Sequence, residues 1–573
     1  MRQKNNKFFL YFKNVGFQVK NLYKKFASLL SRPVFIFIIS VSINTILFTL
    51  FFCFVTPHFQ TNDDPVIMEF ASGVRIGQPS EYLIYINVII GKLLSLLYLN
   101  FPGINWYPIF FYLIHFISMT VILYCFLLKK KNIYSFLIYL LLFSFLELYQ
   151  LANLQFTTTA FIAGLAGFIL LLTFLDEKGK KFYLAIAGSI ILITITGVIR
   201  RNVFYLLLGL SAVVFGLKFL ERKSWRIPVI LIIIVLLFGL LSFLNDNYYN
   251  KDEDWSFYLE YNKYMAKVIN YPYFDYSDNR NIYDSVGWSA NDATMFRSWF
   301  FCHPEVYSLA NIKHIASNVK ITRGAEETFT TLKESFSIMD LRLKWFTGSF
   351  LIIAILLLRK DKNKYIFSVI FSSLIISIYL SYLGRLTNWV FAPIIFFTAA
   401  TAAFFICDDE ISDRIKILRN IILKSTILVV CLALVIVGFI FTSNESKVNM
   451  AKQQELEQVI EKLSEENKIY VVQGGANLED KVISFSIPQK KEYLNMIQLG
   501  WMIHTPFYYK ALEKYSIDDI YEAIIDRDDI YVICGQGLIE VIRKFVYEHY
   551  NRDVSSTMLY ELVNFPVNVY KFN

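Results

Sequence analysis

The sequence predicts an α-helical multi-pass membrane protein with about eleven transmembrane helices, followed by a C-terminal extracytoplasmic α/β domain. Of its 573 residues, 55% are hydrophobic and 18% charged, and the mean hydropathy is +0.45. Several apolar runs reach about 20 residues, enough to cross roughly 30 Å of hydrocarbon. Lys and Arg cluster between these runs, where they orient helices and meet anionic lipids. The formal net charge of +9 therefore indicates membrane lipids as partners, and no nucleic acid.

The N-terminal residues 1–33 form a basic tail with almost no acidic residue, which places them in the cytoplasm. The first apolar run begins near Pro33, and no small-residue cleavage pattern follows it, so it is expected to be a retained anchor instead of a signal peptide. Richness in Ile, Asn and Lys suggests an AT-rich bacterial genome, and hence the bacterial plasma membrane.

The segment 81–99 is barely long enough to span a bilayer. Polar residues recur along one helical face of it, namely Asn87, Gly91, Lys92 and Ser95. Such a helix prefers to lie in the membrane interface. The next run, 107–128, ends in three lysines, which are cytoplasmic only if the segment 81–99 does not span. We therefore expect a first external loop over 56–106 with a surface helix in it.

The remaining apolar runs are expected to cross the membrane in alternating directions. Most of the turns that this topological frame places in the cytoplasm are basic, as the positive-inside rule requires. The expected spans are 34–55, 107–128, 133–150, 157–175, 182–198, 203–219, 227–244, 344–358, 365–382, 386–407 and 419–441. The frame predicts a transmembrane domain over 34–441, with a second external loop over 245–343. The C-terminus is then outside.

Residues 442–573 are expected to form the extracytoplasmic domain. A charged helical stretch opens it, and strand-like runs "IYVVQGG", "VISFSI" and "DIYVICG" then alternate with the helical runs "SIDDIYEAI" and "LIEVIRKFVYEHY". This order is typical of a small α/β domain.

The stretch "TNDDP" places two carboxylates, Asp63 and Asp64, just after the first span. One interpretation is a helix start, in which Asn62 or Asp63 caps a helix with Pro65 in its first turn. The other is catalysis, which is compatible with a cap because a cap fixes the carboxylate in place. Glu69 follows in the same loop and is a candidate substrate-binding residue.

A carboxylate pair after the first span, an interfacial helix in a long first loop, the "NWYP" opening of the second span and a C-terminal extracytoplasmic domain together resemble the GT-C superfamily. These are membrane glycosyltransferases that use polyprenyl-phosphate-linked sugars. The resemblance implies that Asp63 or Asp64 acts as a base or orients the acceptor. It also implies a polyprenyl-phosphate-linked sugar and an extracytoplasmic glycan acceptor as partners.

Such a reaction needs a carboxylate to accept the acceptor's proton and fixed positive charge near the leaving phosphate. Arg200 and Arg201 lie in the turn between the fifth and sixth spans, and Arg385 opens the tenth. All three are basic residues on the side where few are expected, and arginine binds phosphate with two parallel hydrogen bonds. The alternative is that they reach toward lipid phosphates.

The second loop offers Trp288, Asn291 and Asp292 as a candidate sugar subsite, since aromatic faces stack on sugars and amide or carboxylate groups bind hydroxyls. The alternative is a capped helix with packed aromatic residues. Glu147 is expected either to line a cavity or to lie in the headgroup zone, and the second is favoured. No residue spacing indicates a metal site or a cofactor, although a divalent metal stays open.

The sequence thus favours a glycosyltransferase of the GT-C type that modifies an extracytoplasmic glycan or cell-surface glycopolymer. A transporter, flippase or polymerase of lipid-linked glycans is the alternative, and a non-catalytic assembly protein is a third. Transporters place their polar residues near the midplane, often on broken helices, whereas here the candidates gather at the outer surface.

Overall fold

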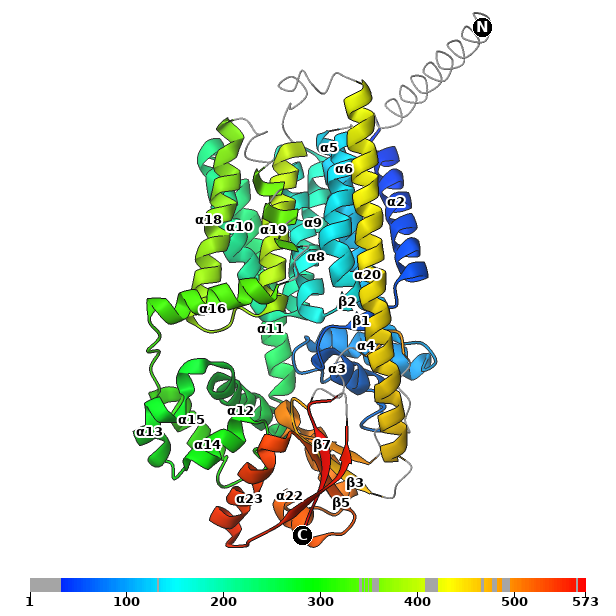
Figure 1. Cartoon of the computed structure of the whole chain (residues 1–573). Coiled ribbons are helices and arrows are strands. Elements are labelled where there is room, and N and C mark those ends of the chain that lie inside the picture. The colour runs from blue at the N-terminus through cyan, green and yellow to red at the C-terminus, as the bar shows by residue number, and fades with distance from the viewer. Residues whose placement is uncertain are drawn as a thin grey trace, which may run out of the picture.

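The computed structural model describes residues 32–130, 133–339, 343–344, 346–348, 350–352, 360–407, 421–464, 468–476, 482–486, 495–562 and 565–573. Within them a bundle of long apolar helices stands on a smaller assembly of short helices and a sheet (Figure 1). The predicted fold class, a multi-pass helical protein with a C-terminal α/β domain, is confirmed.

Ten helical segments of the described residues are long and apolar enough to cross a membrane. They are α2 (Pro33–Phe54), α5 (Trp106–Lys129), α6 to α7 (Ile133–Ala152), α8 (Phe156–Phe174), α9 (Lys180–Ile199), α10 (Arg201–Arg222), α11 (Arg226–Tyr249), α18 (Lys360–Tyr382), α19 (Asn388–Cys407) and α20 (Ile421–Ser464). The span expected at 344–358 lies largely outside the described residues.

Helix α8 lies at the centre of the bundle and is buried almost all round. Small residues allow this close packing, because a Cβ on Gly167 would lie 3.0 Å from the carbonyl oxygen of Ser189 in α9. Transmembrane helices approach most closely where small residues remove the side chains between their backbones. The first residue of α8, Phe156, lies beside Arg200 of the α9–α10 turn, with 4.9 Å between the guanidinium and the ring centre.

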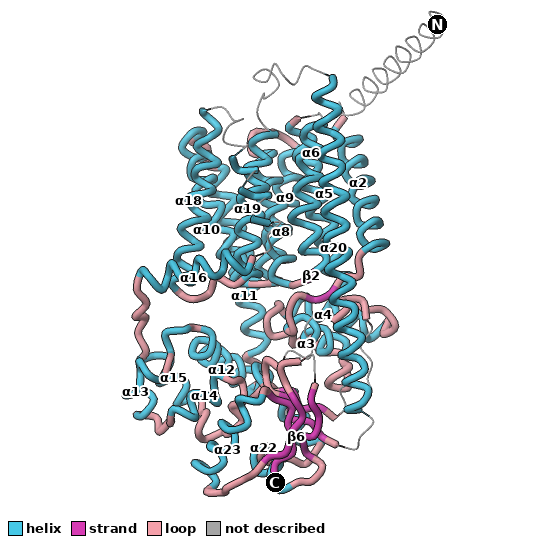
Figure 2. Tube along the Cα trace, in the orientation of Figure 1, coloured by secondary structure: helices cyan, strands magenta, loops and turns pink. Residues whose placement is uncertain are grey.

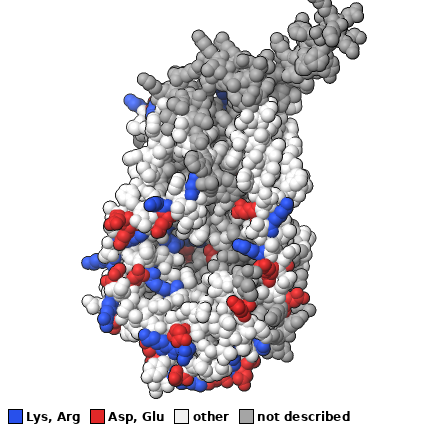
Figure 3. Space-filling model, in the orientation of Figure 1, with Lys and Arg blue, Asp and Glu red and all other residues white. Residues whose placement is uncertain are grey.

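One end of the bundle carries the first loop, the segment after α11 and the C-terminal sheet, and we call this end the loop side (Figures 1 and 2). The lysines at the end of α5 and the start of α9 lie at the opposite end, as the alternation of the helices requires. On the face shown in Figure 3, charged residues gather over the loop side and are sparse over the bundle.

The surface helix of the first loop is α4 (Val88–Asn100), with 13 residues. It is about 20 Å long, too short to cross a bilayer, and lies beside α3 (Asp63–Ser72) at the loop side (Figure 1). The helix begins at Val88, later than residue 81, because the Asn87 side chain caps it by accepting a hydrogen bond from the Ile89 N–H at 3.0 Å.

The segment after α11 folds into short helices and shares its core with the C-terminal sheet. These helices are α12 (Glu253–Asn270), η2 (Pro272–Phe274), α13 (Tyr276–Asp284), α14 (Ala290–Arg297) and α15 (Leu309–Asn318). The last helix of the segment, α16 (Ala325–Ile338), packs instead against α18 and α19 of the bundle. Tyr521 of the C-terminal domain donates a hydrogen bond to the Phe300 carbonyl at 2.9 Å, deep in that common core. Helices α12 to α15 and the C-terminal sheet are therefore packed together as one body.

The C-terminal sheet has five strands in the order β4-β3-β5-β7-β6. Strand β3 is parallel to β4 and β5, and β7 is antiparallel to β5 and β6. The strands are β3 (Ile469–Val472), β4 (Met496–Gln498), β5 (Ile530–Cys534), β6 (Ser556–Glu561) and β7 (Asn568–Phe572); the helices are η5 (Gly500–Met502), α21 (Pro506–Lys514), α22 (Ile520–Asp526) and α23 (Gln536–Tyr550). The apolar run of β3 suits a strand buried on both faces.

The strand expected at "VISFSI" does not join this sheet in its described residues, 482–486. That segment instead reaches back to the first loop, where Phe59 donates a backbone hydrogen bond to Val482 at 2.8 Å and Ser484 donates one to Pro57 at 2.9 Å. Phe59 belongs to β1 (His58–Phe59), which pairs in parallel with β2 (Asn153–Leu154). The C-terminal domain is thereby tied to the loop that carries the carboxylate pair.

Helix α20 has 44 residues and a length of about 66 Å, roughly twice the hydrocarbon thickness. The boundary expected between 441 and 442 therefore falls inside a continuous helix that leads from the bundle toward the sheet (Figure 1). The Thr56 N–H donates a hydrogen bond to the Ser446 hydroxyl of this helix at 2.8 Å. The first loop is thus held against α20 as well.

Glu147 is fully buried, and its carboxylate contacts His115 Nδ1 at 2.7 Å inside the bundle. The other ring nitrogen of His115 lies 3.0 Å from the Thr159 hydroxyl of α8. Glu147 closes a π-helical turn, η1 (Phe143–Glu147), which re-aims its side chain. Glu147 is therefore buried inside the bundle and does not lie exposed in the headgroup zone as expected; His115 contacts one carboxylate oxygen, and the other has no hydrogen-bond partner among the described residues.

Candidate functional site

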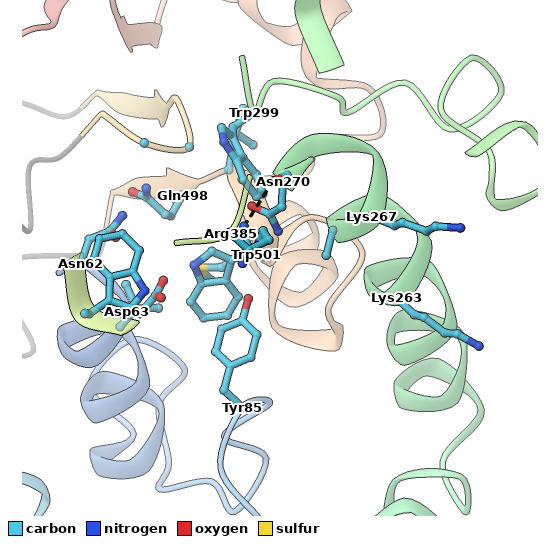
Figure 4. Close-up of a pocket in the computed structure, with 18 of the residues that line it drawn as sticks. Asn62, Asp63, Tyr85, Lys263, Lys267, Asn270, Trp299, Arg385, Gln498 and Trp501 are labelled. Atoms are coloured by element: carbon cyan, nitrogen blue, oxygen red, sulfur yellow. Dashed lines mark hydrogen bonds between the residues drawn. The ribbon is translucent and has the colours of Figure 1, made fainter. Parts of the chain in front are cut away.

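A cavity of about 590 Å³ lies on the loop side, where the bundle meets the C-terminal domain (Figure 4). Its wall is built from α3, the α9–α10 turn, α12, the α18–α19 turn and the ends of strands β3 and β4. The lining residues used below are Asp63, Tyr85, Arg200, Asn270, Trp299, Arg385, Gly474, Gly475, Gln498, Gly500 and Trp501. Segments more than 400 residues apart in sequence thus share one polar chamber.

Asp63 begins α3 and lines the cavity. The Trp501 side chain hydrogen-bonds to its carboxylate, and the positive charge of Arg200 acts on it. Burial raises the pKa of Asp63 above its ordinary value, while Arg200 and the Trp501 hydrogen bond oppose that rise. The preceding residue, Asn62, makes no side-chain capping hydrogen bond, so the capping interpretation has no support at that position.

Asp64 points away from the cavity and is fully buried. One carboxylate oxygen accepts hydrogen bonds from the Tyr107 hydroxyl at 2.9 Å and from the Phe156 N–H at 3.1 Å. Burial raises the pKa of Asp64 well above its ordinary value, and the Tyr107 hydrogen bond only partly offsets this. Asp64 therefore joins the starts of α5 and α8 to α3, and in doing so fixes where Asp63 stands.

Arg200 and Arg385 reach the same cavity from different turns of the bundle. The Arg200 guanidinium lies 4.8 Å from the ring centre of Tyr85 and 4.9 Å from that of Phe156. Arg385 donates a hydrogen bond to the Asn270 carbonyl at 3.4 Å (Figure 4). Both guanidinium groups are partly exposed, which leaves donor hydrogens facing the chamber.

Arg201 is not among the residues that line this cavity. Its guanidinium pairs with Asp246 at 2.5 Å, and both side chains are close to half exposed. The residue borders a neighbouring cavity of about 730 Å³, which shares Arg200 and Tyr85 with the first. Arg200 thus borders both cavities, whereas Arg201, the first residue of α10, borders only the second.

The other sequence candidates also lie away from the cavity. Glu69 is buried and forms an ion pair with Arg75 at 2.6 Å. Trp288 is buried and donates to the Val306 carbonyl at 2.7 Å, which is a packing role. Asn291 and Asp292 sit in the first turn of α14, where Ser289 and Asp292 form a capping box, and Asn291 donates to the Val541 carbonyl at 3.0 Å.

Among the described residues, Asp292, Glu548 and His549 could hold a metal ion by spacing, with ligand atoms within 4.8 Å of one another. The Asp292 carboxylate and His549 Nε2 already lie 2.8 Å apart, in hydrogen-bond contact. None of the three lines the cavity, so an ion bound there would not touch a reaction in it.

Sequence reasoning missed most of the wall that the C-terminal domain supplies. Gln498 and Trp501 lie in this wall, beside Trp299 of the second loop, and all three line the cavity (Figure 4). The paired glycines of "IYVVQGG" and the "LGW" stretch after β4 were the only local signals, since glycines directly after buried strands often mark a ligand site.

The fold and the site define a multi-pass helical protein with a carboxylate and two arginines in one chamber at the end of its bundle. No family model and no curated protein matches the sequence. Among solved structures, the chain is similar to ArnT from Cupriavidus metallidurans in the apo state, at 10% identity over 93% of this chain and 97% of that chain, with a TM-score of 0.40. ArnT bound to undecaprenyl phosphate matches over the same shares, at 9% identity and a TM-score of 0.39.

Proposed function

We propose that this protein is a GT-C-type glycosyltransferase that moves a sugar from a polyprenyl phosphate to a glycan or cell-surface glycopolymer outside the cytoplasm. The observation that carries the proposal is the single cavity shared by Asp63, Arg200 and Arg385. A base and two phosphate-binding cations are what the reaction requires, and three distant segments of the chain bring them together.

In the proposed mechanism, the acceptor hydroxyl attacks the anomeric carbon while its proton passes to the Asp63 carboxylate. The bond between the anomeric carbon and the phosphate oxygen breaks, and the polyprenyl phosphate leaves as an anion. That anion is stable, so no strong general acid is needed. Arg200 and Arg385 hold it through hydrogen bonds that strengthen as charge moves onto the leaving oxygen.

The prenyl chain needs an apolar path beside the phosphate site. A second cavity, of about 500 Å³, lies between α16, α18 and α19 and is lined almost entirely by apolar groups. It shares the first turns of α19 with the polar chamber, since Trp389 lines one cavity and Phe391 the other. Ser335 of α16 donates to the Leu386 carbonyl at 2.7 Å and holds this wall beside Arg385. A lipid phosphate could therefore rest at Arg385 with its chain among these helices.

The decisive test is the surface glycan of a deletion strain carrying either the wild-type gene or the Asp63→Asn variant. A transferase predicts that one sugar disappears from an otherwise intact glycan and that only the wild-type gene restores it. Loss of the whole polymer would instead support a polymerase or flippase and would refute the proposal.

The proposed orientation places the loop side outside the cell, and single-cysteine labelling in intact cells measures it. We expect an impermeant thiol reagent to modify Gln78→Cys and to leave Lys178→Cys unmodified, because these exposed residues lie at opposite ends of the bundle. Position 75 is less suitable than 78, since the Arg75 side chain is largely buried against Glu69. The background variant replaces Cys53, the exposed native cysteine of the described residues, with Ser. Labelling of Lys178→Cys without labelling of Gln78→Cys would show that the protein has the opposite orientation.

The pH dependence of transfer should report the Asp63 carboxyl. Its pKa is raised by burial, and a base works only when ionised, so activity should fall on acidification with a midpoint above the ordinary value of about 3.9. Arg200 lowers this pKa, so Arg200→Gln should move the acidic limb to higher pH. The profile is measured at saturating donor, with Arg280→Gln as a distant control. An unmoved limb in Arg200→Gln would contradict the assignment of Asp63 as the titrating base.

A further inference from the structure

Trp299 has an unusual backbone conformation at the edge of the cavity. Its φ of 59° lies in the left-handed region, which bulky residues rarely adopt. The residue follows α14, and its side chain is partly exposed where it lines the chamber. Strain of this kind is kept where surrounding contacts impose it, and it is concentrated at functional sites.

Glycines on the two neighbouring strand ends make room for this tryptophan. A Cβ on Gly474 would lie 2.3 Å from the Gly500 Cα and 2.7 Å from the Trp299 Cβ, so any side chain there would push the three segments apart. Gly475 and Gly500 have φ angles of 79° and 85°. The backbones after β3 and β4 therefore meet directly, and the indole lies against them.

A glutamine locks this arrangement to the rest of the domain. The Gln473 amide donates to the Ser298 carbonyl at 3.0 Å and accepts from the Gly535 N–H at 3.0 Å. It thereby joins the ends of β3 and β5 to the residue before Trp299. Ligands of open α/β sheets bind outside the carboxyl ends of parallel strands, and this is where the cavity lies.

We infer that Trp299, together with Gln498 and the Gly474–Gly475 backbone, forms the subsite that binds the sugar ring of the glycan acceptor. The apolar face of the ring stacks on the indole, and the Gln498 amide binds ring hydroxyls. This subsite rests on the proposed function and deepens it, because it assigns the acceptor to the wall opposite the membrane. A lipid-linked donor is tethered to the bundle, whereas a glycan arrives from the aqueous side.

The two substrates therefore have separate walls within one chamber. The arginines project from turns between membrane helices, and Trp299 belongs to the body formed with the C-terminal sheet. Asp63 lines the same cavity to one side of Arg385, with Trp501 next to it (Figure 4), and Trp501 belongs to the segment that directly follows β4. An acceptor stacked on Trp299 would thus present its hydroxyls to the cavity that Asp63 also lines.

The test measures binding of two probes to the full-length protein in lipid nanodiscs: surface glycan extracted from the deletion strain, and undecaprenyl phosphate. We expect Trp299→Ala and Gln498→Ala each to weaken glycan binding, about tenfold or more for the tryptophan, without changing undecaprenyl phosphate binding. Trp299→Tyr should restore part of the affinity, because it keeps an aromatic face. Trp225→Ala is the matched control, since that tryptophan is 73% exposed at the opposite end of the bundle.

The outcomes separate the subsite from the function it rests on. If Trp299→Ala binds both undecaprenyl phosphate and the glycan with wild-type affinity, the subsite is overturned and the proposed function is not. Absence of binding by both probes to the wild-type protein would overturn the proposed function. A Trp299→Ala variant that loses both probes together would show a folding defect, and Trp299→Gly, which removes the left-handed strain, then decides. Recovery of undecaprenyl phosphate binding without glycan affinity would support the subsite, and any other result would refute it.

Discussion

Replacing Asp63 with Asn should abolish sugar transfer while the protein still inserts and folds. The amide keeps the shape of the carboxylate but cannot accept a proton, and loss of a general base costs about 10²–10⁴ in rate. Asn can still accept the Trp501 hydrogen bond that positions this side chain. Transfer is measured as turnover of a purified variant in nanodiscs, or as the modified sugar in complemented cells.

The neighbouring carboxylate provides the matched control for this substitution. Asp64→Asn retains an oxygen that can accept from Tyr107 and Phe156, so it should reduce activity less than Asp63→Asn. Any defect should accompany a lower melting temperature, because Asp64 holds three helices together and does not line the cavity. Wild-type activity in Asp63→Asn, with loss in Asp64→Asn at unchanged stability, would reverse the two roles.

Removing the cavity arginines should have the second largest effect. Arg385→Ala and Arg200→Ala each remove a charged donor to phosphate, worth about 1.5–3 kcal/mol, which corresponds to roughly 10–150-fold in affinity for the lipid donor. The readout is the KM for donor alongside the direct affinity for undecaprenyl phosphate. Arg→Lys should recover only part of the loss, because an ammonium group lacks the paired donor geometry.

Two further arginines sharpen that experiment. Arg280→Ala is the control for lost charge, since its side chain is 73% exposed in α13. Arg201→Ala tests the separation of the two chambers, and we expect a smaller effect because Arg201 pairs with Asp246 outside the site. If Arg201→Ala alone weakened donor binding, the phosphate would have to lie in the neighbouring cavity.

Most of the helical architecture followed from the sequence. Apolar runs of sufficient length can only span or stay buried, so the observed spans match those expected wherever the structure describes them. The polar stripe through Asn87 and Ser95 likewise indicated a helix that does not cross, and α4 is too short to do so. These features depend on periodicity and length, which are local properties of the chain.

The composition of the site could be predicted only in part. Asp63, Arg200 and Arg385 were singled out by their unusual position at the ends of spans, and the structure brings them into one cavity. Trp288 and Trp299 are both tryptophans of the same loop, yet only the second lines the chamber. No local pattern distinguishes them, because the difference lies in which of them meets the strand ends of a domain some 170 residues later.

By itself, the sequence determined that this protein is a bundle of membrane-length helices with a carboxylate pair after the first of them and an α/β domain at its end. These outcomes follow from hydrophobic length and local patterning, which act over a few turns of chain. The tertiary structure alone decided that Asp63 faces a cavity whereas Asp64 is buried, and that residues 482–486 run back to pair with the first loop. Adjacent residues of a helix differ by about 100° in direction, so which carboxylate is free depends on what packs around α3, and that packing comes from segments hundreds of residues away.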